Sequence, residues 1–214
     1  MKLPEDPDAR FCPRCGVPIV LPEKTATVLE PTAEKARLTS ERLNRRTTLI
    51  IMVLLCIIVT FFGALLPINV SEAKERFKEY SKVEEAINNF GVAIIYGNNL
   101  MHNVIMFTPL IGPLYGLYVL FSTGRFIAAL ALLRGSNPVI LMLSVLAFPH
   151  AWIEYLSYAL AMSESYWLTS MIIKHRLKDE AAVFFKTMSM CALLLLAAAF
   201  IEMFLINYLA GFSS

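Results

Sequence analysis

The chain has 214 residues, of which 57% are hydrophobic and 17% are charged, and its net charge is +2. Soluble domains usually carry about 25% charged and about 45–50% apolar residues. Here Asp, Glu, Lys and Arg are missing from four long stretches, residues 47–71, 86–124, 135–153 and 187–201. Such stretches exclude an ordinary soluble enzyme, a disordered chain and a basic nucleic-acid-binding domain. They indicate an all-α protein that crosses a membrane several times as a helical bundle.

Residues 1–31 form a proline-rich tail that cannot be one long helix, because proline lacks the backbone donor. Within this tail, Cys12 and Cys15 are separated by two residues and followed by Gly16, which is the spacing of half a zinc knuckle. The tail supplies no further Cys or His to complete four ligands. Three interpretations stay open: Zn²⁺ shared between two chains, a redox pair of thiols, or a degenerate knuckle without metal.

Residues 32–47 predict a polar helix that leads into a membrane domain over residues 48–210. About 20 residues at about 1.5 Å each cover the hydrocarbon core, so this domain has room for five spans. The predicted spans lie near 48–67, 90–107, 110–133, 139–163 and 187–209. Prolines and a glycine in residues 107–113 separate the second span from the third, and a re-entrant pair of half-helices is the alternative there.

The segment 71–89 is highly charged, but Phe77, Tyr80, Val83 and Ile87 recur in it at three- to four-residue spacing. This pattern predicts an amphipathic helix, either on the outer membrane surface or packed on the outer ends of the spans. Five spans place the two termini on opposite sides. The positive-inside rule assigns the N-terminus to the cytoplasm and the C-terminus to the exterior. In this orientation two basic segments lie inside, one before the first span and one in the polar loop before the last span.

Polar side chains inside the predicted spans are candidate functional residues, because an ionisable group near the bilayer centre costs at least about 2.5–3.5 kcal/mol on insertion scales. Counting depth along each span at about 1.5 Å per residue places these side chains in one layer, between the middle of the membrane and its outer side. We therefore predict a shared buried polar cluster or a water-filled cavity. Its predicted members are Asn98, Asn99, His102, Arg125, His150, Glu154 and Glu202.

Three uses of this layer stay open. Hydrogen bonds between the polar side chains could hold the spans together, an ion or substrate pathway could run through them, or a metal could bind to the His and Glu side chains. His150 and Glu154 are four residues apart and share a helix face. Their spacing is not that of the HExxH metalloprotease motif, and no nucleophile accompanies them, so no catalytic residue is predicted.

Four segments of the membrane domain carry a family resemblance. They are Asn98-Asn99, GPLYGLYVLFSTGR at 112–125, FPHAWIEYLSYALA at 148–161 and AAFIEMFLI at 198–206. In this order they resemble the stage II sporulation protein M family over residues 48–210. Ala151 stands where this family usually has Gly, Thr123-Gly124 replaces its usual Asn-Gly, and Ala159 lies one position later than the usual Ala.

The resemblance implies a five-span membrane protein. Sporulating members belong to the peptidoglycan-remodelling machinery of engulfment, in which they anchor partner hydrolases at the membrane. The tail with Cys12 and Cys15 instead resembles archaeal and environmental members. The polar positions of the family correspond here to Asn98, Asn99, His150, Glu154 and Glu202.

From these observations we expect a non-enzymatic scaffold or assembly protein of the cell membrane. We expect a homo-oligomer, with a dimer favoured, whose chains share Zn²⁺ at Cys12 and Cys15. The expected partners are the lipid bilayer and other membrane or cell-envelope proteins, and no nucleic acid. The alternative is a small transporter or channel subunit that uses the layer of His150, Glu154 and Glu202, and an intramembrane metal-dependent enzyme is the third.

Overall fold

The computed structural model describes residues 31–175 and 177–211, with side chains described from residue 44 to residue 208 except at 176, 178 and 179. Packing divides the chain into two units, Met1–Asn44 and Arg45–Ser214. Over the described ranges all regular secondary structure is helical, as predicted. Its helices are α1 (Pro31–Leu65), α2 (Val70–Phe90), α3 (Val92–Met106), α4 (Ile111–Arg134), α5 (Pro138–Leu146), α6 (Pro149–Ile173) and α7 (Leu177–Gly211). The predicted zinc residues Cys12 and Cys15 lie outside the described residues.

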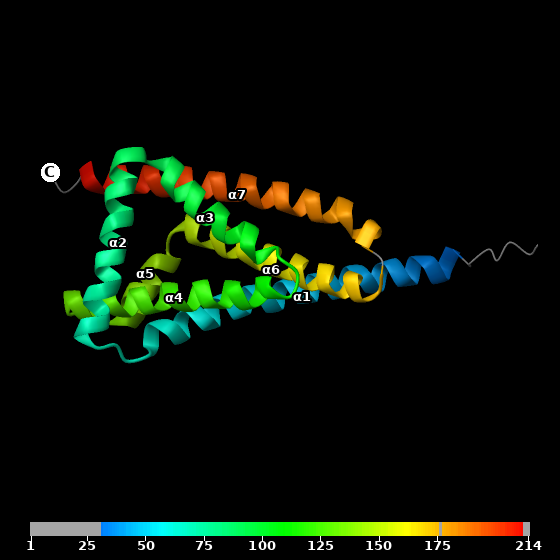
Figure 1. Ribbon diagram of the computed structural model, residues 1–214, viewed down its shortest axis with the longest axis horizontal. Helices are drawn as coiled ribbons and strands as arrows, with labels where there is room; N and C mark the ends of the chain where they lie inside the picture. Colours follow the sequence, from blue (N-terminus) through cyan, green and yellow to red (C-terminus); the bar gives the residue numbers. More distant parts are fainter. Residues whose placement is uncertain (1–30, 176, 212–214) are drawn as a thin grey trace, which may run out of the picture. The chain divides into compact units, whose positions relative to one another are not determined.

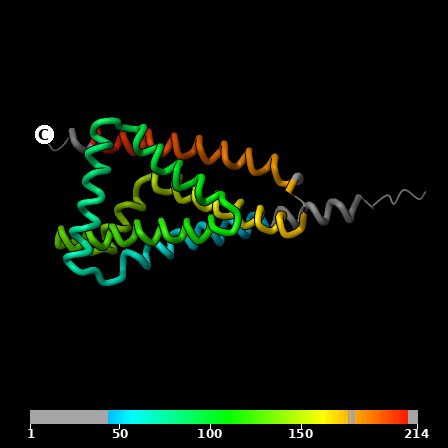
Figure 2. Tube along the Cα trace, viewed as in Figure 1, coloured from blue at the N-terminus to red at the C-terminus, as the bar shows by residue number. Residues whose placement is uncertain are grey.

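In the second unit, the long helices α4, α6 and α7 run in alternating directions, and α2 lies across one end of them (Figures 1 and 2). α6 packs against both α4 and α7. The shorter helix α3 contacts α4, α6 and α7, and α2 packs against α3 and α4. One hydrophobic core joins the bundle, with fully or nearly fully buried side chains from five helices. Its members include Cys56, Met106, Leu120, Met162 and Leu195.

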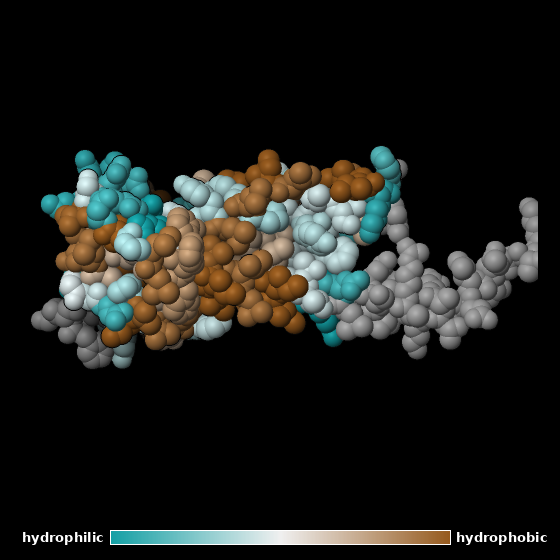
Figure 3. Space-filling view, turned by 90° about the horizontal axis from the view of Figure 1, so that it is seen from below, coloured by the Kyte–Doolittle hydropathy of each residue, from teal (hydrophilic) through white to brown (hydrophobic). Residues whose placement is uncertain are grey.

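Three helical segments are each long and apolar enough to cross a membrane, namely Asn44–Leu65, Ile111–Arg134 and Glu180–Tyr208, and the pair α5 and α6 would make a fourth. Figure 3 shows a broad hydrophobic band on one face, with hydrophilic side chains gathered toward its ends. The predicted second span corresponds to α3, which has 15 residues. At about 1.5 Å per residue, α3 is shorter than the hydrocarbon core of about 30 Å. The prediction of five spans is therefore not confirmed.

The predicted fourth span, 139–163, is not one continuous helix. α5 ends at Leu146, α6 begins at Pro149, and the two are bent by 84°. Proline disfavours helical geometry in the residue before it, and Phe148 accordingly has an extended backbone with ψ 135°. Trp152 Nε1 donates to the carbonyl of Leu146 at 2.7 Å. The bend thus satisfies one of the carbonyls that the end of a helix leaves free.

The turn between α3 and α4 falls within the predicted break and is held by α6. Leu110 has a positive φ of 66° with ψ −48°, which is uncommon for a residue other than glycine. Its N–H donates to Thr169 Oγ1 at 2.8 Å, and Ser165 Oγ donates to the carbonyl of Thr108 at 2.7 Å. Gly112 approaches α3 so closely that a Cβ atom would lie 1.9 Å from a backbone carbonyl oxygen. This turn therefore requires glycine at that position.

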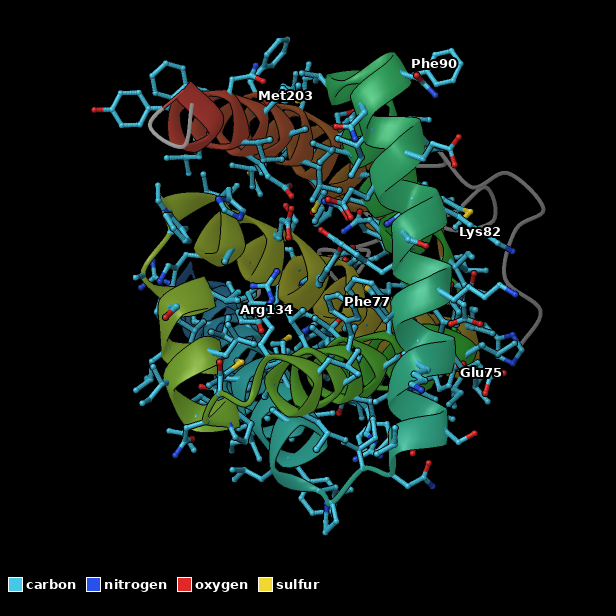
Figure 4. The ribbon with its side chains drawn as sticks, turned by 90° about the vertical axis from the view of Figure 1, so that its left-hand side faces the viewer. Glu75, Phe77, Lys82, Phe90, Arg134 and Met203 are labelled. Atoms are coloured by element: carbon cyan, nitrogen blue, oxygen red, sulfur yellow. The ribbon has the colours of Figure 1, made fainter. Side chains whose placement is uncertain are left out.

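α2 is the amphipathic helix that the sequence predicts over 71–89. It begins after Asn69, whose side chain accepts the backbone N–H three residues on at 2.8 Å, and it ends at Gly91, where a φ of 56° turns the chain into α3. Figure 4 shows Phe77 pointing from α2 toward the bundle, and Glu75 and Lys82 pointing to the opposite side. α2 therefore packs on the ends of other helices, and its place relative to the membrane surface stays a prediction.

Candidate functional site

A cavity of about 360 Å³ lies between α2 and the bundle, lined by side chains of α2, α3, α4, α6 and α7. Figure 4 looks onto the end of the bundle at which α2 lies. Five of the seven residues of the predicted polar layer line this cavity. They are Asn98, Asn99 and His102 of α3, Glu154 of α6 and Glu202 of α7. Polar residues from three helices that are distant in the sequence thus meet around one space.

Hydrogen bonds between helices organise the wall of this cavity. Asn99 Nδ2 donates to Glu154 Oε1 at 2.6 Å, and the hydroxyl of Tyr158 donates to Asn99 Oδ1 at 3.1 Å. His102 Nδ1 lies 2.7 Å from the hydroxyl of Tyr115 on α4. Asn99 therefore links α3 to α6, since both its donor and its acceptor atoms contact side chains of α6.

Two acidic side chains, and no Lys or Arg among the described residues, line the cavity. Glu154 and Glu202 are both half-buried and line the same cavity. Among residues 44–208, as far as side chains are described, no Lys or Arg forms an ion pair with either carboxylate. Two carboxylates that share a poorly hydrated site repel each other when both are ionised. The cavity therefore suits a positive charge supplied from elsewhere.

Arg125 does not line the cavity, although depth counting placed it in the same layer. It is 6% exposed, and its Nε and Nη2 donate to the two carboxylate oxygens of Glu72 at 3.2 and 2.8 Å. Its Nη1 donates to the carbonyls of Leu66 and Pro67, just beyond α1, at 2.7 and 3.1 Å. Hydrogen bonds from Arg125, joined by one from Arg76, hold the pKa of Glu72 below its ordinary value of 4.5.

His150 also lies away from the cavity wall. It occupies the first turn of α6, where its ring stacks on Phe148 with 5.8 Å between ring centres. Its Nδ1 is buried and has no hydrogen-bond partner within the described part of the chain. Because α6 begins at Pro149, His150 lies at the corner with α5, one turn before Glu154. The cavity thus includes Glu154 but not His150.

No three His, Cys, Asp or Glu side chains in the described ranges are close enough together to hold a metal ion. The two glutamates and one histidine of the cavity are therefore not spaced as the ligands of one metal ion. The predicted zinc residues Cys12 and Cys15 lie outside these ranges.

A comparison with protein families finds that the model of the family described as Stage II sporulation protein M matches residues 50–205. The chain belongs to the stage II sporulation protein M family. The family resemblance given by the sequence is thereby confirmed. Searches of curated proteins and of solved structures found no match. Together with its long apolar helices, the family membership identifies a membrane protein.

In this stage II sporulation protein M family member, three tyrosines contribute to the cavity that sequence reasoning did not assign to it. They are Tyr80 of α2 and Tyr155 and Tyr158 of α6. Tyrosine carries an apolar ring and a polar hydroxyl and is common in cores and at interfaces, so its presence in the sequence gives no signal of a site. The positions of these residues around the cavity follow only from the packing of α3 against α6 and of α2 against α3 and α4.

A second polar cluster of this family member lies where α6 and α7 meet α1. Arg45 donates to Glu164 at 3.4 Å and also to Glu180, and its guanidinium lies 4.8 Å from the ring centre of Trp167. Both glutamates are at most 5% exposed. Both lie between the fourth and fifth predicted spans, in the segment predicted as a polar loop. That prediction was wrong, because α6 continues to Ile173 and α7 begins at Leu177. No separate signal marked Glu164 and Glu180 as buried.

Proposed function

We propose that this protein is a non-enzymatic scaffold or assembly protein of the cell membrane. In this proposal its N-terminus lies in the cytoplasm and its C-terminus outside, and it acts as a homo-oligomer together with other cell-envelope proteins. The anchoring role of sporulating members of the family agrees with this proposal. The single observation that supports it best is the fixing of α2 across the end of the bundle.

Several contacts restrain α2. Arg125 holds Glu72 in its first turn, Ala73 is fully buried, and the ring of Tyr80 stacks on Phe126 of α4 with 4.5 Å between ring centres. The opposite face of α2 is charged and exposed. Because α2 is already ordered, its charged side chains can meet a partner without the entropy loss of ordering a flexible segment. A docking surface of this kind is what a scaffold requires.

The polar groups inside the bundle also favour a structural role. Asn103 Nδ2 donates to the carbonyl of Ser157 at 3.0 Å, in addition to the contacts of Asn99 with Glu154 and of Ser165 with Thr108. Hydrogen bonds between helices hold membrane bundles together, because lipid offers these groups no alternative partner. A bundle joined in this way presents α2 on a rigid support.

The test of this proposal is site-specific photo-crosslinking in cells that naturally make the protein. A photoreactive residue at Lys82, on the outward face of α2, is compared with one at Leu193, which is exposed and apolar on α7. We expect discrete protein adducts from position 82, their loss when Arg125→Gln releases α2, and adducts only with lipid from position 193. Position 75, on the same face of α2, is a second site for the photoreactive residue. Absence of protein adducts from both position 82 and position 75 would contradict the scaffold role.

A second candidate function, a small transporter or channel subunit, is favoured by the cavity that contains Glu154 and Glu202. It predicts ion or solute flux in proteoliposomes that Glu154→Gln changes without unfolding the protein. Glu79→Gln, at an exposed position of α2, is the matched control. If Glu154→Gln lowers only the thermal stability and the proteoliposomes show no specific flux, the scaffold function is favoured.

A further inference from the structure

We propose that the cavity between α2 and the bundle binds a small organic cation of the ammonium class, with Glu154 and Glu202 as its anionic partners. This inference does not rest on the scaffold role, and it deepens the transport alternative by naming a class of ligand. Binding is measured on the purified protein, without flux or partner proteins. Failure of this proposal is therefore distinguishable from failure of either proposed function.

The first argument is charge. A buried carboxylate is costly unless it is paired or hydrogen-bonded. Glu154 receives one hydrogen bond, from Asn99, and Glu202 receives none that the described residues provide. Of the two basic side chains of α4, Arg125 pairs with Glu72, and Arg134 lines a different cavity between α2 and α4. A cation from outside would give both carboxylates a partner.

The second argument is the chemistry of the remaining wall. Tyr80, Tyr155 and Tyr158 line the cavity together with aliphatic side chains such as Val83 and Ile87. Aromatic faces attract cations, and ammonium groups are recognised by aromatic side chains combined with acidic ones. The aliphatic part of the wall matches the carbon body of an organic cation. The wall therefore offers complementary contacts to both parts of such a ligand.

The third argument is size and donor count. A cavity of about 360 Å³ falls within the range of small-molecule sites, about 300–1,000 Å³. Divalent ions such as Ca²⁺ instead require several oxygen ligands at short distance. Within the described ranges, no three acidic, His or Cys side chains come close enough together for that. An organic cation therefore fits this cavity better than a bare metal ion.

The test is the binding of alkylammonium chlorides, tetramethylammonium and butylammonium, to the purified full chain in detergent. Thermal unfolding and titration calorimetry are recorded at constant ionic strength, with NaCl as the reference salt. We expect at least one ammonium ion to raise Tm in a saturable manner. Glu202→Gln should raise its Kd about tenfold or more, the effect expected when a charge-assisted contact is lost.

Glu202→Gln is the decisive variant, because Glu154→Gln also alters the hydrogen bond with Asn99 and could affect folding. Glu75→Gln, on the face of α2 that points away from the bundle (Figure 4), is the control and should bind as the wild type does. Three results would overturn the proposal. These are no saturable binding of either ammonium ion, unchanged binding by folded Glu202→Gln, or an equal response to NaCl alone.

Discussion

Arg125 of α4 holds both carboxylate oxygens of Glu72, the third residue of α2, at 3.2 and 2.8 Å. The same guanidinium caps two carbonyls just beyond α1. One buried side chain therefore joins three helices at the corner of the bundle, and two-point contacts between arginine and carboxylate are among the strongest hydrogen bonds in proteins. Its loss should release the first turn of α2.

This pair predicts a dependence of stability on pH. Because hydrogen bonds from Arg125 lower the pKa of Glu72 below 4.5, the ionised carboxylate stabilises the folded state. That contribution is present above the ordinary pKa and is lost as the pH falls through the lower pKa of the folded state. The Tm of the wild type, followed by scanning fluorimetry in detergent from neutral to acidic pH, should therefore fall more steeply on the acid side than that of Glu72→Gln.

Glu75→Gln is the control for this titration, because its side chain points away from the bundle (Figure 4). It should keep the full acid sensitivity of the wild type. If the profiles of Glu72→Gln and the wild type coincide at acidic pH, Glu72 does not contribute to stability in the way that its contacts imply.

The glycines of α3 and α4 predict a graded series of alanine variants. At Gly112 a Cβ would meet backbone at 1.9 Å, whereas at Gly116 it would meet the flexible end of Met162 at 2.4 Å. Overpacking a core costs about 1–3 kcal/mol of stability. We expect the loss of stability in Gly112→Ala to lie at or above the upper end of this range, and the loss in Gly116→Ala to lie near its lower end. Gly97 has nothing within 4 Å, so Gly97→Ala should stabilise α3 by about 1 kcal/mol.

These three variants are compared by thermal unfolding under the same detergent conditions. The order of stability expected is Gly97→Ala first, then Gly116→Ala, then Gly112→Ala. Equal effects at positions 112 and 116 would show that the close approach between the ends of α3 and α4 can relax.

The cluster around Arg45 predicts a rescue. Arg45→Leu leaves Glu164 and Glu180 buried without their cation, and breaking a buried pair from one side costs about 3–5 kcal/mol. Adding Glu164→Gln and Glu180→Gln should restore much of that stability, because neutral side chains do not require a cation. Unfolding temperatures of the single and triple variants measure the effect.

Arg46→Leu is the matched control for this cluster, since Arg46 is exposed. Its unfolding temperature should stay close to that of the wild type. A triple variant no more stable than Arg45→Leu would mean that Arg45 stabilises the bundle mainly through its stacking on Trp167.

The tail predicts a metal-linked dimer. If two chains share Zn²⁺ through Cys12 and Cys15, the purified protein should contain about one Zn²⁺ per two chains, the stoichiometry of a four-thiolate site. Elemental analysis and light scattering measure the metal and the mass together. Cys12→Ser should lose both the metal and the dimer, whereas Cys56→Ser, in the core, should keep the metal. Protein without zinc whose oligomeric state is unchanged by Cys12→Ser would refute this prediction.

The sequence predicted part of the candidate site because depth along a helix can be counted. Counting placed Asn99, Glu154 and Glu202 at similar levels, and the structure has all three in one cavity wall; that they form a functional site stays a prediction. Depth says nothing of the direction in which a side chain points around its helix. Arg125 therefore shared the predicted level but faces Glu72, at the corner of α1 and α2.

What the sequence by itself determined is local. It determined the uncharged stretches that require a membrane, the polar and apolar faces of α2, and the helix breaks at proline. These features depend only on the spacing of residues along the chain and on backbone chemistry. Only the tertiary structure decided the 84° bend before α6, the partners of Arg125 and the burial of Glu164 and Glu180. Those depend on which faces of distant helices meet, and that is settled by packing over the whole bundle rather than by any one segment.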